Sequence, residues 1–488
     1  MGPILNSYPD SIGSTFKEIN KILDLKEFKN VFSSYYILPS IFHTDLDRGF
    51  SVQDYGLEES LITQDDLNNL KDKNMTLILD IVLNHLSVLS PEFQDLIKNG
   101  NHSKYKDFFI DWNTFWKDKG KLSKEGYIIP DKQYTDPMFF RKPGLPVMMV
   151  EYENGQRVPY WNTFYSEERI IDGKKQYLGQ MDLNINSPLV WQYYKETLHQ
   201  LKEYGASIIR LDAFGYASKI VGRANFLNDP ETWDILDKIN ALAKEEGLSL
   251  LPEIHASYKE GIYKQIAVKG YYVYDFFLPG LILYTLHFKD ATYLISWIQE
   301  ITNHHYKTIN MLGCHDGIPM LDLKGLLPDD LIQETIDHLV ENGGYVKNLE
   351  GNKKMYYQVN ETYFSALDER EDLLLLSRAI QVFTPGIPQV WYLDLFAGKN
   401  NLEALTIGHK EINRTNLTVE EVKDGLNNEV VYKQLELLRL RNTHPVFLNP
   451  TYSIYKTNEG FNITVRNENN CLTLKVNLQN DQFEIIDN

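Results

Sequence analysis

The chain has 488 residues, 43% of them hydrophobic and 24% charged, which is typical of a globular enzyme too long to fold around one compact core. Its formal net charge of -18 argues against nucleic acid and anionic membranes as partners, because both favour a basic surface. The chain has two cysteines, no apolar run of membrane-spanning length and no basic-then-apolar start. We therefore expect a cytoplasmic protein without a disulfide framework.

Strand-like and helix-like segments alternate along most of the chain, which predicts a parallel sheet with crossover helices. Residues 31–39 are the predicted second strand, and the capping-box spacing at the start of 63–73 predicts a helix. Two longer helices are predicted at 187–205 and 229–247, each with a proline near its start and a glycine at its end. The inward stripe predicted for the second of these helices consists of Trp233, Leu236, Ile239 and Leu242. Later strands are predicted at 271–278 and 386–392.

Two long segments interrupt this repeat, and the last part of the chain changes to short alternating strands. The pattern predicts an α/β fold: a (β/α)8 TIM barrel with two inserted subdomains and a small C-terminal β domain. The predicted parts are the first part of barrel domain A (1–85), inserted domain B (86–186), the second part of the barrel (187–317), inserted domain B′ (318–366), the third part of the barrel (367–442) and the C-terminal β domain (443–488).

Four of the strand-like runs end in charged or imidazole side chains. These ends are Asp80 to His85, Arg210-Leu211-Asp212, Glu253-Ile254-His255 and His315-Asp316. Side chains alternate along a strand, so Arg210 and Asp212 share one face. For one such run, a structural ion pair is the more frequent explanation. Four runs whose carboxyl ends meet at one barrel mouth predict an active site instead.

These four ends resemble the signature regions of the α-amylase clan, glycoside hydrolase family 13. More narrowly, the chain is similar to the sucrose phosphorylase subfamily from about Tyr8 to about Asn442. The segments that carry this second resemblance are 210–216, 252–255, 315–318, 385–390, 397–400 and 412–414. The resemblance implies a retaining glucoside phosphorylase, which reversibly converts sucrose or a sucrose-like α-glucoside and phosphate to α-D-glucose 1-phosphate and a free acceptor.

The expected catalytic residues are Asp212, Glu253 and Asp316. Retention requires a carboxylate nucleophile and a carboxylic acid roughly 5 Å apart, and Asp212 and Glu253 end neighbouring strands. We expect Arg210 to keep Asp212 ionised as the nucleophile, and Glu253 to start protonated as the acid. The resemblance implies that Asp316 holds sugar hydroxyls and stabilises the cationic transition state.

The resemblance also implies a set of residues around the glucosyl ring. Asp47 and Arg414 are expected to hydrogen-bond to the ring, Phe50 to stack on it, and His85 and His315 to donate to its hydroxyls. For Phe50, a plain core aromatic is an equally frequent alternative, and for Arg414 the alternative is a solvated surface charge. The full predicted substrate-binding set is Asp47, Phe50, His85, Arg210, His315 and Arg414.

Phosphate requires positive charge beside Glu253 in a chain whose overall field repels anions. Arg141 and Lys142 precede Pro143-Gly144-Leu145-Pro146, a position that resembles the mobile acceptor loop of the subfamily. A basic dipeptide is more often exposed to solvent. The predicted acceptor and phosphate-binding set is Arg141, Lys142, Tyr216, His255, Tyr357 and Gln358.

Departures from the subfamily pattern leave the acceptor open. The basic pair Arg141-Lys142 resembles relatives that act on sucrose 6'-phosphate, whereas Tyr357 before Gln358 resembles the plain sucrose enzymes. Phosphorylases of glucosylglycerol and glucosylglycerate share the catalytic set, and a hydrolase or transglucosylase of the clan is a more distant alternative. A non-catalytic scaffold is disfavoured because all three acidic residues are present.

No metal and no cofactor are expected. The pair His304-His305 lacks further ligands at metal-binding spacing, and no glycine-rich nucleotide fingerprint follows a strand. The expected partners are small molecules: an α-glucoside, inorganic phosphate and glucose 1-phosphate. The expected oligomeric state is a monomer or a homodimer.

Overall fold

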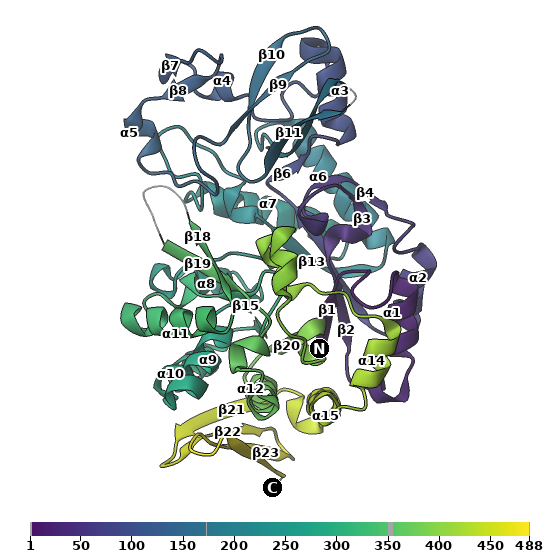
Figure 1. The fold of residues 1–488 in the computed structure, drawn as a ribbon, viewed down its shortest axis with the longest axis vertical. Coiled ribbons are helices and arrows are strands. Elements are labelled where there is room, and N and C mark those ends of the chain that lie inside the picture. The colour runs from purple at the N-terminus through teal and green to yellow at the C-terminus, as the bar shows by residue number, and fades with distance from the viewer. Residues whose placement is uncertain (1, 172, 350–354, 488) are drawn as a thin grey trace.

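The computed structural model describes residues 2–171, 173–349 and 355–487. At its centre, eight parallel strands form one nearly closed barrel (Figure 1). In chain order they are β1 (Ile4–Ser7), β2 (Ser34–Ile37), β5 (Thr76–Val82), β13 (Ala206–Asp212), β14 (Ser249–Pro252), β15 (Val273–Asp275), β16 (Thr308–Asn310) and β20 (Ile387–Trp391). The ends of the hydrogen-bonded order, β14 and β15, lie side by side. The predicted barrel is confirmed.

Helices cover the outside of the barrel. β5 and β13 are therefore buried along almost their whole length, as expected for parallel strands with helices outside and packed side chains inside. The covering helices include α2 (Gln64–Asp72), α6 (Pro188–Glu203), α7 (Glu231–Glu245), α8 (Ile262–Val268), α9 (Leu278–Phe288), α10 (Thr292–His304), α12 (Glu371–Phe383) and α15 (Glu429–Thr443). The capping box predicted for α2 is present, with Thr63 and Asp66 as its two members.

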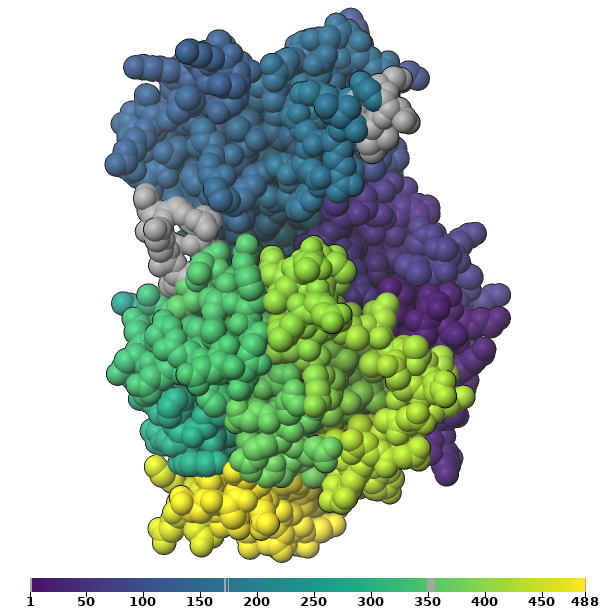
Figure 2. Space-filling model, viewed as in Figure 1, coloured from purple at the N-terminus to yellow at the C-terminus, as the bar shows by residue number. Residues whose placement is uncertain are grey.

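Between β5 and α6 the chain leaves the barrel and forms the blue end of the molecule (Figures 1 and 2). Its main elements are β6 (His85–Ser87), α3 (Pro91–Asn99), α4 (Trp112–Phe115), β9 (Val147–Glu151), β10 (Arg157–Trp161), β11 (Ser166–Ile171) and β12 (Lys174–Asp182). Trp112, Trp116 and Trp161 pack into a small core of their own. β12 returns antiparallel to β6, so the excursion begins and ends at the barrel mouth.

A second excursion follows β16 and brings another antiparallel sheet to the same mouth. It contains β17 (Ile318–Pro319), α11 (Asp329–Glu341), β18 (Tyr345–Leu349) and β19 (Met355–Asn360), and β19 pairs with both other strands. The boundaries of the two inserted domains remain predictions.

The chain ends in a four-stranded antiparallel sheet of β21 (Thr451–Lys456), β22 (Gly460–Arg466), β23 (Cys471–Asn477) and β24 (Gln482–Asp487). This sheet lies at the end of the molecule opposite the first excursion (Figure 1). It confirms the expected C-terminal β structure. Within the described ranges, no helix combines the length and the apolarity that crossing a membrane requires.

Candidate active site

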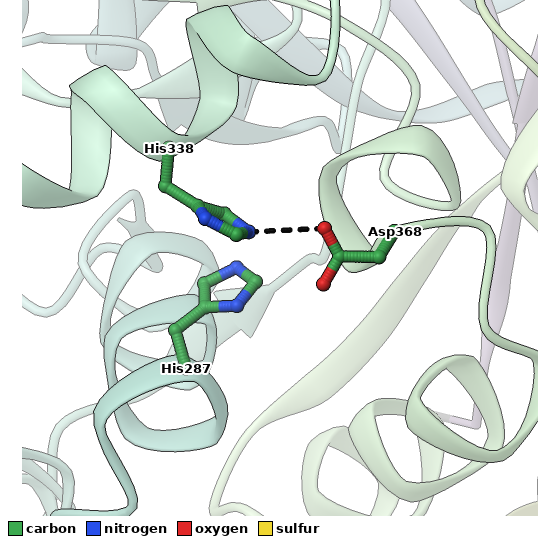
Figure 3. Close-up of side chains that lie close together, drawn as sticks. All are labelled: His287, His338 and Asp368. Carbon is green, nitrogen blue, oxygen red and sulfur yellow. Dashed lines mark hydrogen bonds and ion pairs between the residues drawn. The ribbon is translucent and has the colours of Figure 1, made fainter.

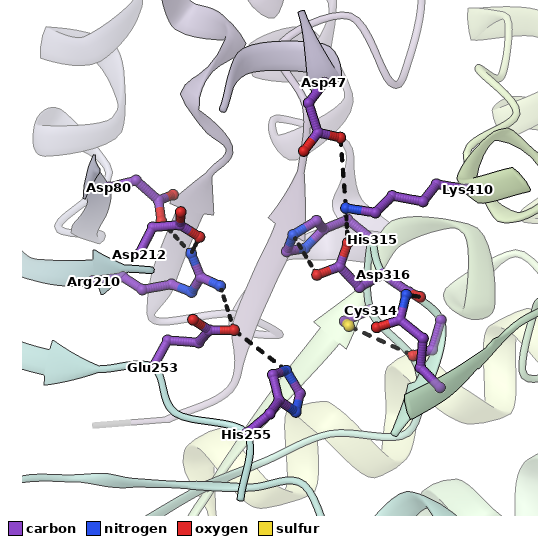
Figure 4. Close-up of polar contacts among 12 residues, drawn as sticks. Asp47, Asp80, Arg210, Asp212, Glu253, His255, Cys314, His315, Asp316 and Lys410 are labelled. Atoms are coloured by element: carbon purple, nitrogen blue, oxygen red, sulfur yellow. Dashed lines mark hydrogen bonds and ion pairs between the residues drawn. The ribbon is translucent and has the colours of Figure 1, made fainter. Parts of the chain in front are cut away.

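The candidate active site lies where the barrel strands end at their carboxyl side (Figure 4). Asp212 is the last residue of β13, and Glu253 directly follows β14. The two strands are in parallel register, with Leu211 opposite Pro252, so the next pair in register is Asp212 and Glu253. The strand pairing therefore brings the two carboxyl groups to one place, as the sequence predicted.

Arg210 connects three carboxyl groups. Its Nη1 donates to Asp80 Oδ1 at 2.6 Å and to Asp212 Oδ1 at 3.0 Å, and its Nη2 lies 3.5 Å from Glu253 Oε1. Asp80 is fully buried and also accepts a hydrogen bond from the Tyr36 hydroxyl at 2.8 Å. Because its guanidinium is buried and held from several sides, Arg210 fixes the positions of the Asp212 and Glu253 carboxyl groups relative to each other.

Asp212 and Glu253 differ in their affinity for protons. Burial raises the pKa of Asp212 to about 8, because Arg210 only partly offsets the loss of solvent and the nearby Glu253 adds negative charge. Burial also acts on Glu253, but Arg210 and His255 outweigh it and lower the pKa of Glu253 to about 2. The pair thus holds one proton at neutral pH. The directions of these two shifts favour the proton on Asp212 in the free enzyme, whereas the expected roles place it on Glu253 when substrate is bound.

His255 is clamped between two carboxylates. Its Nε2 lies 3.3 Å from Glu253 Oε1, and its Nδ1 lies 3.1 Å from Asp322 Oδ2. Burial opposes the charged imidazole, but Asp322 and Glu253 outweigh burial and raise the pKa of His255 to about 10. The ring also stacks on Phe276, with 3.9 Å between ring centroids. His255 is therefore a positively charged imidazolium that is held beside Glu253, the expected acid.

Asp316 faces two cations on the opposite side of the site. Lys410 Nζ lies 2.8 Å and Arg414 Nη2 3.4 Å from Asp316 Oδ1. Burial alone would raise its pKa, but Lys410, His315 and Arg414 outweigh burial and hold the pKa of Asp316 well below its usual range. Asp316 is therefore a carboxylate at neutral pH. Lys410 also reaches Asp47 Oδ1 at 3.5 Å.

Phe50, His85 and His315 line the same cavity as Asp212 and Asp316. Phe50 stacks on His315 with 5.1 Å between ring centroids. Burial lowers the pKa of His315 to about 3, and its buried Nδ1 has no hydrogen-bond partner among the described residues. His85 Nε2 donates to the Phe50 carbonyl at 3.0 Å, and its expected hydrogen bond to sugar hydroxyls stays a prediction.

A second cavity adjoins the first on the far side of Glu253. Arg141, Tyr216, Glu253 and Tyr357 line both cavities. The Arg141 guanidinium carbon lies 4.4 Å from the centroid of the Tyr357 ring, and Nη1 donates to the Tyr216 hydroxyl at 3.5 Å. No carboxylate of the described residues lies within ion-pair distance of Arg141. Arg141 is therefore a cation that packs against aromatic rings where the two cavities meet.

Three residues of the predicted binding sets, Lys142, Gln358 and Arg414, are not among the residues that line either cavity. Lys142 hydrogen-bonds to Asn162 and to the Ser166 hydroxyl, outside both cavities, and burial lowers its pKa to about 8. Gln358 donates to the backbone carbonyl of Asp316 at 2.7 Å, so it supports the loop of Asp316. Arg414 is buried and donates to the His315 carbonyl at 2.8 Å, so the surface-charge alternative for Arg414 is wrong.

Sequence reasoning missed Lys410 and Asp322. Lys410 lies in a 3-10 segment, His409–Asn413, and Asp322 in another, Leu321–Leu323. Neither segment has strand periodicity, and neither residue ends an apolar run. The only available signal was proximity along the chain: Lys410 precedes Ile412-Asn413-Arg414, and Asp322 follows His315-Asp316.

Comparisons with known proteins agree with this geometry. The chain matches the family described as "Alpha amylase, catalytic domain" over residues 19–269. It is 51% identical over 457 residues to the sucrose 6(F)-phosphate phosphorylase of Ilumatobacter coccineus, which covers 91% of this chain and 87% of that protein. It is 33% identical over 503 residues to the sucrose phosphorylase of Streptococcus mutans, which covers 100% of this chain and 98% of that protein.

A solved structure shares nearly the whole fold. The crystal structure of sucrose 6F-phosphate phosphorylase from Thermoanaerobacter thermosaccharolyticum matches with a TM-score of 0.89 and 34% sequence identity. The match covers 99% of this chain and 94% of that chain. The resemblance inferred from the signature segments is thereby confirmed: the chain belongs to the α-amylase family of glycoside hydrolases, within its sucrose phosphorylase subfamily.

Proposed function

We propose that this chain is a retaining phosphorylase that transfers a glucosyl group from a sucrose-like α-glucoside to inorganic phosphate. The observation that carries the proposal is Arg141, a cation without a carboxylate partner in the described chain, beside Glu253 at the junction of two cavities. Water as the attacker would need no such charge. A phosphate anion would, because the net charge of -18 otherwise repels it.

In the first half-reaction, an Asp212 carboxylate oxygen attacks the anomeric carbon. The bond from that carbon to the acceptor oxygen breaks, and Glu253 gives its proton to the departing oxygen. The products are a glucosyl ester on Asp212, a free acceptor and a Glu253 carboxylate. Asp316 lies across the cavity as a fixed negative charge, which favours the positive charge that develops on the sugar ring.

In the second half-reaction, an oxygen of hydrogenphosphate attacks the same carbon. The ester bond to Asp212 breaks, and the phosphate proton passes to Glu253, which restores both groups and yields α-glucose 1-phosphate. Two inversions give overall retention. Arg141 would hold the incoming phosphate on the side of the sugar that the acceptor has left.

The shared proton must move before the first step. Burial favours the protonated form of Asp212, and His255 together with Arg210 favours the anionic form of Glu253. Sugar hydroxyls that donate to Asp212 would lower its pKa, since hydrogen bonds to a carboxylate favour the charged form. Substrate binding would thereby transfer the proton to Glu253 and prepare both groups together.

The two excursions from the barrel would build the acceptor side jointly. We propose 86–186 and 318–366 as inserted domains, with Arg141 supplied by the first and Tyr357 by the second. The second cavity is lined by the cations Arg141 and Lys324 and by the carboxylates Glu253 and Glu260. The 51% identity to a sucrose 6(F)-phosphate phosphorylase supports an acceptor that carries its own phosphate, such as fructose 6-phosphate, as a second candidate beside plain fructose. The cytoplasmic location remains a proposal that is consistent with a sequence of only two cysteines, Cys314 and Cys471, which lie far apart along the chain.

The test is phosphate-dependent turnover on sucrose, sucrose 6'-phosphate, glucosylglycerol and glucosylglycerate. We expect glucose 1-phosphate from one of the two sucrose substrates. The product is measured separately from free glucose at saturating phosphate. Free glucose as the main product would reject phosphorolysis in favour of a hydrolase, and turnover of glucosylglycerol or glucosylglycerate alone would reassign the acceptor.

The substitution Arg141→Gln tests whether Arg141 binds the incoming phosphate. We expect the KM for phosphate to rise at least ~10-fold, because a charge-assisted contact to the anion is lost. The KM for the glucoside should change less. Lys142→Gln is the matched control, since Lys142 lies outside both cavities, and it should leave the KM for phosphate within about twofold. Equal effects of the two substitutions would contradict the role of Arg141.

A further inference from the structure

Two histidines and an aspartate from distant parts of the chain converge away from the active site (Figure 3). His338 Nε2 lies 3.1 Å from Asp368 Oδ1. The rings of His287 and His338 are 3.9 Å apart between centroids. One ligand atom from each of the three residues lies within 4.8 Å of the others. The three candidate ligand atoms are close enough for small side-chain movements to bring all of them to one metal ion.

Two of the three residues, His287 and His338, lie at helix ends that favour positive charge. His287 is in the last turn of α9, and His338 is in the last turn of α11. Helix carboxyl termini carry partial negative charge, so two helix dipoles and one carboxylate face the same point. Asp368 follows the 3-10 helix Ser365–Leu367 with φ at 57°, a left-handed conformation uncommon outside glycine.

Neighbouring groups hold these side chains in place. The Asn342 amide donates to Asp368 Oδ1 at 2.8 Å, and His287 Nε2 lies 3.2 Å from the Ala366 carbonyl oxygen. Hydrogen bonds to outer groups orient the ligands of protein metal sites in the same manner. An ordinary ion pair would account for His338 and Asp368, but it would not account for the second imidazole packed against the first.

We propose that His287, His338 and Asp368 bind a divalent transition metal, with Zn²⁺ as the best match. Two imidazoles and one carboxylate suit Zn²⁺, which prefers four ligands at about 2.0–2.2 Å from nitrogen and oxygen. The His338 and Asp368 side chains are 31% and 39% exposed, so water can supply the fourth ligand and the ion can enter. The ion would tie α9 to α11 and to the turn before α12.

This link has a structural consequence for the second excursion. α11 packs against α9 and against β18, the strand that pairs with β19. A metal between α9 and α11 would therefore fasten the second excursion to the outside of the barrel. We expect a gain in thermal stability when the metal binds, because only the folded chain assembles the three ligands.

The experiment uses tag-free, full-length protein that has been stripped with a chelator. Zn²⁺ is titrated in competition with a chromophoric chelator, and binding of one ion per chain with a Kd below ~10 μM is expected. The thermal midpoint should rise with added Zn²⁺. Co²⁺ in place of Zn²⁺ should give the visible absorption of a four-coordinate site.

His338→Ala and Asp368→Asn should each weaken Zn²⁺ binding at least tenfold and abolish the rise in thermal midpoint. His304→Ala is the matched control, because His304 also lies in the last turn of its helix but belongs to no such cluster of the described residues, and it should bind like the parent. Circular dichroism and turnover of the metal-free variants establish that they fold. Unchanged binding in both variants, or no stoichiometric binding by the parent, would overturn the proposal.

Discussion

Asp212 and Glu253 both contact the Arg210 guanidinium, but substitutions at the two positions should affect catalysis differently because their proposed roles differ. Glu253→Gln removes the proton donor, so the first step should slow at least ~10³-fold with sucrose, whose departing oxygen needs protonation. α-Glucosyl fluoride should react much faster than sucrose in this variant, because fluoride leaves without a proton. Rates of the first half-reaction are measured as acceptor or fluoride release.

Asp212→Ala provides the comparison. Without the nucleophile, we expect both donors to lose at least ~10³-fold in turnover, and fluoride as leaving group should give no relief. If the activated donor relieved Asp212→Ala and not Glu253→Gln, the two roles would have to be exchanged. That outcome matters here because burial raises the pKa of Asp212 above that of Glu253.

The proton shared by the pair predicts an alkaline limit. Below about pH 8 the pair keeps one proton, and above it the pair loses that proton, because the raised pKa of Asp212 is the last to titrate. The first step needs one proton, so kcat/KM for the donor should fall as pH rises through about 8. A pH profile at saturating phosphate measures this limit, and a flat profile to pH 10 would contradict the assignment.

The sequence located polar side chains at the barrel mouth where they directly end or follow a buried strand. Asp212, Glu253 and His255 each follow an apolar run, so both the strand and its polar end were visible in the sequence. Lys410 and Asp322 were not predictable, because 3-10 segments from other parts of the fold bring them to Asp316 and His255. Likewise, the sequence could not separate Arg141 from Lys142, whose opposite orientations depend on the packing around Asn162.

At the scale of elements, periodicity predicted the helices better than it predicted their buried faces. α7 was expected to bury Trp233, Leu236, Ile239 and Leu242. Leu236 and Ile239 are buried, but Trp233 and Leu242 are only half-buried, and Ile235 and Ala243 are buried in their place. The buried stripe has nearly the predicted direction but is narrower, and Trp233 and Leu242 pack against the core from its two edges.

Asp275 joins the end of one strand to the start of the next helix. Its Oδ1 accepts from the backbone N–H groups of Phe277 and Leu278 at 3.2 and 3.0 Å and from Trp297 Nε1 at 3.0 Å. Asp275→Ala would leave these buried donors unpaired, which should cost about 2–4 kcal/mol of unfolding free energy. Thermal unfolding measures the loss.

Asp275→Asn is the control for that prediction. Burial raises the pKa of Asp275 to about 7, so a neutral side chain with one acceptor oxygen should be tolerated there. We expect the Asn variant to lose less than half as much stability as the Ala variant. An Asn variant as unstable as Ala would show that the negative charge, and not the acceptor oxygen, stabilises the start of α9.

At the scale of the whole molecule, the eight barrel strands and their order follow from the strand–helix repeat, but the return of the first excursion to the barrel does not. That return depends on Asp182 at the end of β12. Asp182 accepts from the Thr163 backbone at 2.8 Å, from the Asn84 amide at 3.0 Å and from Lys219 Nζ at 2.9 Å. These partners come from three separate segments of the chain, so no local sequence pattern predicts the contacts.

Lys219→Met should therefore loosen the first excursion from the barrel. The substitution leaves Asp182 as a buried charge without its cation, which should cost about 3–5 kcal/mol of unfolding free energy. The double variant Lys219→Met, Asp182→Asn removes both charges and should recover at least about 1 kcal/mol, as coupled neighbours do. Because the excursion carries Arg141, the KM for phosphate should rise in the single variant and recover partly in the double one. Strictly additive losses in both measurements would mean that the buried pair does not hold the excursion in place.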